Sequence, residues 1–256
     1  MHRQIFLYIM PILLSTFIQE SYSKDFNTLK SRADSLYTQG NFSEAILLYD
    51  SILSSNQVAS ELYYNLGNCY YKSGKMPLAI LNYERSLKLN PSDRDTRTNL
   101  SLARSQIQDK SSEPSEFFLI AWWYSMSNML SLVTWKSIGL LLFVLFLALY
   151  LFPVIFPSNR FNGIVRNSSY ILLAISILSN LAAYQQYHRS MISKAAIVMS
   201  ESLSVKSSPN RASTDLFVVH EGTRLEILDG SMEEWFEVEF EEGKSGWVES
   251  KDIEQI

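Results

Sequence analysis

Residues 60–93 read SELYYNLGNCYYKSGKMPLAILNYERSLKLNPSD, and the 34 residues before them, 26–59, read FNTLKSRADSLYTQGNFSEAILLYDSILSSNQVA. Aligned without a gap, the two segments place the same kinds of residue at the same positions. The matched pairs are Ala33 with Gly67, Leu36 with Tyr70, Gly40 with Gly74, Ala45 with Ala79, Ile46 with Ile80 and Tyr49 with Tyr83. Small residues at fixed positions allow two antiparallel helices to cross closely, and the tyrosines fill the gaps between them. The stretch therefore predicts a helical repeat.

This period and these residue types resemble the tetratricopeptide repeat. Residues 94–108 continue the phase and then stop, which predicts a capping helix over the last apolar face. The expected domain covers 24–110, with repeats at 26–59 and 60–93 and the cap at 94–108. Cys69 is expected to be a small buried core residue.

Arrays of this family bind extended peptides on the concave face formed by the first helix of each repeat. The phase of the repeat places amides, tyrosines and charged residues on that face, where amides suit a peptide backbone and tyrosines suit its side chains. The predicted peptide-binding residues are Asn27, Lys30, Asp34, Tyr37, Glu61, Tyr64, Asn65, Asn68, Tyr71, Thr98 and Asn99. The alternative is a solvated face without a peptide partner.

Some repeat domains clamp a C-terminal carboxylate, and this chain resembles them at Lys30 and Asn65. They place an amide where Asp34 stands and basic groups where Asp95 and Asn99 stand. The resemblance therefore argues against carboxylate clamping.

The middle of the chain contains no acidic residue between Glu116 and Glu201. Residues 137–156 are uncharged and, as a helix, would cover roughly 30 Å, the thickness of the hydrocarbon core. A second transmembrane helix is predicted over 169–187, where Ser176, Ser179 and Asn180 can face the first helix. The alternative is one span and one buried helix. The uncharged residues 117–134 favour an interfacial helix over a third span, because only Trp135 and Lys136 would remain for a turn.

The N-terminal residues 1–23 have the pattern of a secretory signal peptide, with an apolar run from Ile5 to Phe17, although an uncleaved anchor is the alternative. Arg160 and Arg166 mark the loop 157–168 as cytoplasmic. Together these features predict a multi-pass protein of a bacterial inner membrane, with both water-soluble domains in the periplasm.

From Lys194 the sequence changes to short alternating runs typical of strands. The order VKSSP, EGTRLEI, WFEV and GKSGWV resembles the bacterial SH3 domain, which implies an all-β SH3-like barrel over 195–256. Members of that family often bind peptidoglycan or peptides. Phe217, Trp235 and Trp247 are candidates for an exposed aromatic patch, with core packing as the alternative.

Composition and motifs exclude several function classes. The last 63 residues hold 14 acidic and 6 basic residues, a net charge of −8, which disfavours nucleic acid as a partner. The sequence has three histidines and shows no phosphate loop, dinucleotide fingerprint or zinc motif. No nucleophile, histidine and acid set is available to the soluble domains, so we expect neither catalysis nor a cofactor.

The fold class is therefore a multi-domain membrane protein: an all-α repeat array, two transmembrane helices and an all-β barrel. That combination resembles the BatE family of the Bacteroides aerotolerance operon. The resemblance implies an interaction scaffold whose partners are other Bat membrane proteins, several with von Willebrand A domains, and a MoxR-type ATPase. It also implies a role in oxygen tolerance or envelope stress. The alternative is a peptidoglycan-binding module; a sensor signalling through its spans finds little support.

Overall fold

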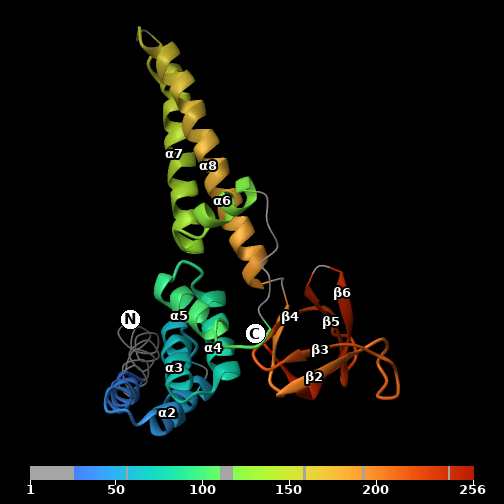
Figure 1. Cartoon of the computed structure of the whole chain (residues 1–256). Coiled ribbons are helices and arrows are strands. Elements are labelled where there is room, and N and C mark those ends of the chain that lie inside the picture. The colour runs from blue at the N-terminus through green and yellow to red at the C-terminus, as the bar shows by residue number, and fades with distance from the viewer. Residues whose placement is uncertain (1–25, 56, 110–117, 158–159, 192–193, 242) are drawn as a thin grey trace, which may run out of the picture.

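The computed structural model describes residues 26–55, 57–109, 118–157, 160–191, 194–241 and 243–256. The predicted signal peptide lies outside these residues. A helical domain and a curved antiparallel sheet lie side by side, and a long hairpin of two helices projects from them (Figure 1). This architecture confirms the predicted fold class, with a helical repeat region, two long apolar helices and a C-terminal antiparallel sheet.

The repeat domain consists of five antiparallel helices. They are a helix over residues 26–38, α2 (Phe42–Ser54), α3 (Ser60–Lys72), α4 (Met76–Leu89) and α5 (Arg94–Arg104). Gly40 and Gly74 end the first helix of each pair at φ of 80° and 75°, a conformation that glycine adopts without steric cost. The Asp93 carboxylate accepts hydrogen bonds from the N–H groups of Asp95 and Thr96 and so caps α5.

The repeat core follows the 34-residue period. Ala33, Ala45 and Ala79 are fully buried, and the larger Tyr49 and Tyr83 are 1% exposed. Gly67 is the tightest position, because a Cβ there would lie 2.7 Å from two ring carbons of Tyr83. The predicted pairing of small residues with tyrosines is therefore how the helices pack. Cys69 is buried as predicted.

The central segment forms α6 (Phe118–Ser127), α7 (Leu132–Ile155) and α8 (Asn162–Met191). The helix predicted over 117–134 is shorter, because Ser131 caps α7 by accepting a 3.2 Å hydrogen bond from the N–H of Thr134. At 10 residues, α6 covers roughly 15 Å, too little to cross a hydrocarbon core. α7 begins before the predicted span 137–156 and ends at Ile155, whereas α8 extends beyond the predicted span 169–187 at both ends. Its first turn therefore lies in the predicted loop 157–168, where Nδ2 of Asn162 donates to the carbonyl of Phe156.

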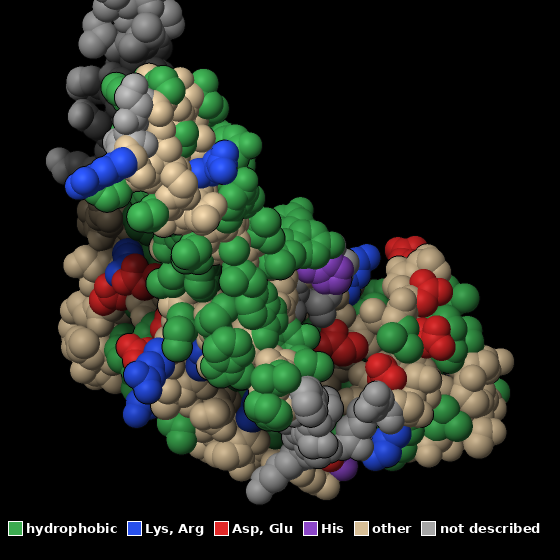
Figure 2. Space-filling view, turned by 90° about the horizontal axis from the view of Figure 1, so that it is seen from above, with side chains coloured by type: hydrophobic (Ala, Val, Ile, Leu, Met, Phe, Trp, Pro, Cys, Tyr) green, Lys and Arg blue, Asp and Glu red, His purple; other side chains and the backbone are tan. Residues whose placement is uncertain are grey.

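Among the described residues, two helices are long and apolar enough to cross a membrane, Leu132–Ile155 and Asn162–His188. Only 6% and 17% of their most apolar windows are buried, so neither is the core helix of a globular domain. Exposed hydrophobic side chains cover the hairpin in the view from above (Figure 2). Between α7 and α8, the Ser176 hydroxyl donates a 2.8 Å hydrogen bond to the carbonyl of Gly139, so a polar group of α8 faces its partner helix as predicted.

The C-terminal domain is a seven-stranded antiparallel sheet curved around one core. Its strands are β1 (Ala195–Val198), β2 (Ser202–Lys206), β3 (Asp215–His220), β4 (Arg224–Asp229), β5 (Trp235–Glu241), β6 (Lys244–Glu249) and β7 (Ile253–Gln255). The strand order is β3-β2-β6-β5-β4-β1-β7, and all seven strands contribute to a single apolar cluster. We call this domain the barrel.

Candidate peptide-binding groove and barrel face

The concave side of the repeat domain carries a hydrogen-bonded unit of three side chains. The hydroxyl of Tyr49, from α2, donates to Oδ1 of Asp34 in the first helix at 2.5 Å. Nδ2 of Asn65, from α3, donates to the same oxygen at 3.2 Å. One carboxylate oxygen thus joins both helices of the first repeat to the first helix of the second repeat.

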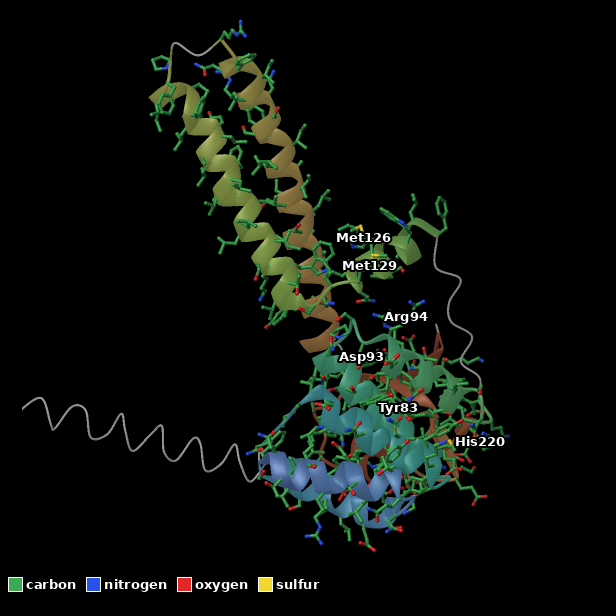
Figure 3. All side chains as sticks on the ribbon, turned by 90° about the vertical axis from the view of Figure 1, so that its left-hand side faces the viewer. Tyr83, Asp93, Arg94, Met126, Met129 and His220 are labelled. Atoms are coloured by element: carbon green, nitrogen blue, oxygen red, sulfur yellow. The ribbon has the colours of Figure 1, made fainter. Side chains whose placement is uncertain are left out.

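The same unit recurs in the second repeat. Oδ1 of Asn68 accepts from the hydroxyl of Tyr83 at 2.7 Å and from Nδ2 of Asn99 at 2.9 Å. In both units the tyrosine lies 15 positions after the acceptor and the asparagine 31 positions after it. We call these six residues the ladder; Tyr83 is marked within the helical domain in Figure 3. Position 102, where a third acceptor would stand, is an exposed leucine.

Lys30 forms ion pairs with two neighbouring acidic residues. Its Nζ lies 3.0 Å from Asp34 and 2.8 Å from Glu61. The hydrogen bond to Glu61, with a further contribution from Asp34, raises the pKa of Lys30 against the effect of burial. The lysine therefore serves to balance two carboxylates and is not an unpaired cation.

The tyrosines of the predicted groove form its half-buried wall. The Tyr64 ring lies 6.3 Å from the Tyr83 ring, and the Tyr71 hydroxyl accepts a 2.6 Å hydrogen bond from Gln106. Tyr37 packs against Phe42 with 5.6 Å between ring centroids. The outlying predicted residues are exposed: Asn27, and Thr98, whose hydroxyl donates to the carbonyl of Arg94. The structure thus brings the central residues together and leaves these two at the margin.

Sequence reasoning missed the ladder tyrosines and Gln106 as parts of this site. The repeat pattern predicts Tyr49 and Tyr83 only as packing residues between the helices, yet their hydroxyls orient the groove acceptors. Burial and neighbouring groups raise the pKa of both tyrosines far above the ordinary value, so the hydroxyls remain protonated donors. The fixed spacing of 15 from each acceptor to its tyrosine is the signal that could have revealed the pairing.

Several amide atoms of the ladder side chains form no hydrogen bond with the described residues. Within the described part of the chain, Nδ2 of Asn68 and the Oδ1 atoms of Asn65 and Asn99 have no protein partner, and all three side chains are partly exposed. One donor and two acceptors on the ladder side chains therefore remain without a partner among the described residues. A peptide backbone needs this combination of groups.

The neighbouring thiol is not a reactive group. Burial raises the pKa of the Cys69 thiol to about 12, with a smaller contribution from the nearby Asp34. The thiolate that nucleophilic or metal-binding chemistry requires is therefore almost absent at neutral pH.

On the barrel, the structure brings together two of the three predicted aromatic residues. Trp247 of β6 lies opposite Glu237 of β5, and Trp235 lies opposite Glu249, so both indoles project from the outer face. Phe217 does not join them, because it pairs with the buried Val205 and packs against the barrel core. The patch is thus a pair of partly exposed tryptophans.

Charged side chains border this pair of tryptophans. Arg211 donates to the two carboxylate oxygens of Glu249 at 2.9 and 2.8 Å, and Lys251 lies 2.9 Å from the same group. These contacts lower the pKa of Glu249 to about 2, so the carboxylate is ionised beside the tryptophans.

Comparisons with known proteins agree with this architecture. Residues 60–93 match the tetratricopeptide repeat, and residues 201–254 match the bacterial SH3 domain. The chain therefore contains one domain of each kind. It is also similar to two proteins called tetratricopeptide repeat protein 16, from Macaca fascicularis and Homo sapiens, with 31% identity over 71 residues in each. That similarity covers 28% of this chain and 8% of those proteins, so it concerns the repeats alone.

Proposed function

We propose that this protein is a membrane-anchored interaction scaffold whose repeat groove binds an extended peptide of a partner protein. Tetratricopeptide repeats are typical of protein–protein interaction, and the hairpin of α7 and α8 supplies two helices able to cross a bilayer. The observation that carries the proposal is the set of unpaired amide atoms along the ladder, on Asn65, Asn68 and Asn99.

The groove chemistry favours recognition of the peptide backbone. Nδ2 of Asn68 would donate to a ligand carbonyl, and Oδ1 of Asn65 or Asn99 would accept from a ligand N–H. Because the ladder holds these side chains in place before binding, little side-chain entropy is lost on binding. Lys30 is already paired with two acids, so a terminal carboxylate on the ligand would find no unpaired cation there.

The setting we propose is the envelope of a bacterium, with both soluble domains in the periplasm. The combination of repeats, hairpin and bacterial SH3 domain supports a role like that of the BatE family, in oxygen tolerance or envelope stress. Partners would then be membrane proteins with von Willebrand A domains and a MoxR-type ATPase. The role is one of binding, not catalysis.

Co-purification from native membranes tests the groove. Substituting Tyr64→Ala together with Tyr71→Ala removes both aromatic contacts and leaves the buried ladder hydroxyls intact. The double variant should lose a partner that the wild-type chain retains. Leu47→Ala is the matched control, because Leu47 is 70% exposed on α2 and is not one of the groove residues. Equal recovery from the double variant would refute the groove proposal, and equal loss from the control would show that the effect is not specific to the groove.

A second candidate function is peptidoglycan binding by the barrel. It is favoured by the bacterial SH3 match, since such domains indicate cell-wall binding, and by Trp235 and Trp247 on one outer face. Flat aromatic rings with polar edges suit partly wet binding surfaces. The detergent-solubilised chain should sediment with purified peptidoglycan, and Trp235→Ala with Trp247→Ala should abolish this. Leu228→Ala, which alters an exposed leucine of β4, should not. Absence of wild-type sedimentation would exclude this candidate.

A further inference from the structure

The repeat domain and the barrel share a hydrophobic contact. Ile197 of β1 is fully buried and belongs to the same apolar cluster as Ile80 of α4 and Ile107. The approach is closest at Gly222, where a Cβ would lie 2.7 Å from Cγ2 of Ile107 and 3.2 Å from Cδ1 of Ile80. Buried apolar contacts of this kind are typical of a domain core and not of two modules joined by a tether.

A carboxylate at the end of the repeat domain holds the turn between β3 and β4. Asp109 accepts hydrogen bonds from the backbone N–H of His220 at 2.6 Å and from the Thr223 hydroxyl at 3.0 Å, and it lies 3.0 Å from Nδ1 of His220. Partial burial works against its ionisation, but these hydrogen bonds outweigh that effect, so the pKa of Asp109 is lowered. His220 is marked at the side of the helical domain in Figure 3.

A second group of polar contacts joins α4 to the last strand. Arg85 donates to Oε1 of Glu254 at 2.8 Å and to the carbonyl of Gln255 at 2.7 Å. Lys88, one helical turn further, donates to the backbone oxygen of Ile256 at 2.7 Å. The barrel is therefore held at two separate edges, the β3–β4 turn and β7.

We infer that the barrel is docked on the repeat domain, against α4 and the segment after α5, so that the two domains form one rigid body. Because residues 109 and 194 then belong to the same body, the chain between them crosses the membrane an even number of times. With α7 and α8 as the two crossings, α6 lies on the side of the soluble domains. This inference depends on neither the peptide nor peptidoglycan.

Docking also divides the barrel surface by function. β1 is buried throughout, as are Gly222 and Thr223 of the β3–β4 turn, so these parts of the barrel are closed to other partners. The outer face with Trp235 and Trp247 belongs to β5 and β6, outside the docking contacts, and is the part of the barrel left for a ligand. Any partner held by the groove and any ligand held by this face would thus be fixed relative to each other.

An engineered disulfide tests the docking in the full-length chain. A Cβ at Gly222 would lie 3.6 Å from Cβ of Ile107, and disulfides have Cβ–Cβ distances of about 3.5–4.5 Å. Ile107→Cys with Gly222→Cys is therefore expected to cross-link nearly completely in membranes under a mild oxidant. A protease site inserted between α7 and α8 reveals the link, because the halves stay joined until a reductant is added. Cys69 does not interfere, since it is buried.

The control pairs Ile107→Cys with Val218→Cys, which places the second thiol at an exposed position of β3. It should leave the two halves separable without reductant. Separable halves from the first pair, with both thiols open to maleimide, would overturn the docking. Equal cross-linking of the two pairs would also overturn it, because random collision would then explain both.

Gly222 has a φ of +82°, so the cysteine substitution can disturb folding. In that case a second measurement tests the docking. Asp109→Lys places a cation where a carboxylate accepts hydrogen bonds. Hydrogen exchange should then accelerate at least tenfold in peptides from both α4 and β1, while α2 keeps its wild-type rate. Unchanged exchange in α4 and β1 would overturn the inference.

Discussion

The two ladder tyrosines occupy equivalent positions but donate to different acceptors, which makes Tyr49→Phe and Tyr83→Phe a matched pair of perturbations. Both side chains are 1% exposed, and each substitution removes a single hydroxyl without altering the ring. Tyr83 donates to the neutral amide of Asn68 at 2.7 Å, whereas Tyr49 donates to the carboxylate of Asp34 at 2.5 Å.

The expected magnitudes follow from the acceptors. A neutral hydrogen bond contributes about 0.5–1.5 kcal/mol to stability, and one to a charged group contributes about 1.5–3 kcal/mol. The Asp34 side chain is 41% exposed, so water replaces part of the lost interaction and places Tyr49→Phe near the lower end of its range. We expect Tyr49→Phe to cost about 0.5 kcal/mol more than Tyr83→Phe, roughly a twofold difference in the opening equilibrium.

Hydrogen exchange with mass spectrometry measures this difference in the full-length chain in detergent, because it reports local opening without requiring two-state unfolding. Peptides from α2 and α4 give the opening free energy around each tyrosine. Tyr37→Phe is the control, since that hydroxyl has no protein partner among the described residues, and it should change stability by less than about 0.5 kcal/mol. A Tyr83→Phe effect equal to or larger than that of Tyr49→Phe would refute the reasoning, as would two effects no larger than the control.

Three further predictions concern other contacts. Gly67→Ala should destabilise the repeat domain by about 1–3 kcal/mol, measured by hydrogen exchange in α3, because the new methyl group overlaps the Tyr83 ring. Gly139→Val should separate α7 from α8 and lower the thermal stability of the hairpin in detergent, because a Cβ there would lie 2.5 Å from Nδ2 of Asn180. Asp109 has a lowered pKa in the folded state, so docking should be strongest above about pH 4, the pKa of an unfolded aspartate, and weaken as the pH falls through the lower folded value. Exchange in β1 at pH 6 and pH 3 measures this; equal protection at both would contradict it.

The sequence predicted the elements better than their ends. The apolar run from Ser137 is strong enough to predict a long apolar helix, but the capping hydrogen bond of Ser131 starts the helix earlier, and its geometry depends on backbone angles. Alternation along β3 also fails to say which face is buried. Only the pairing of Phe217 with Val205 places that ring against the core.

The candidate site was predicted in part for a similar reason. The period of 34 was enough to place Asn65, Asn68 and Asn99 on one side, and the structure brings them together. The hydroxyl contacts of Tyr49 and Tyr83 depend on how far each helix turns toward the groove, which periodicity does not define. The contact of Asp109 with His220 joins residues 111 positions apart in different domains. Neither the repeat period nor the alternation along the strands could therefore predict it.

Under the proposed function, the two ladder units would also limit the length of peptide that the groove binds. Each unit adds one acceptor per repeat, and at the next position Leu102 offers an apolar side chain that is 49% exposed. An amide there, with a further repeat inserted before α5, would extend the binding surface by one unit in the same register. Under the proposed function, the natural groove would be matched to a short stretch of extended chain, with an apolar side chain favoured where that stretch ends.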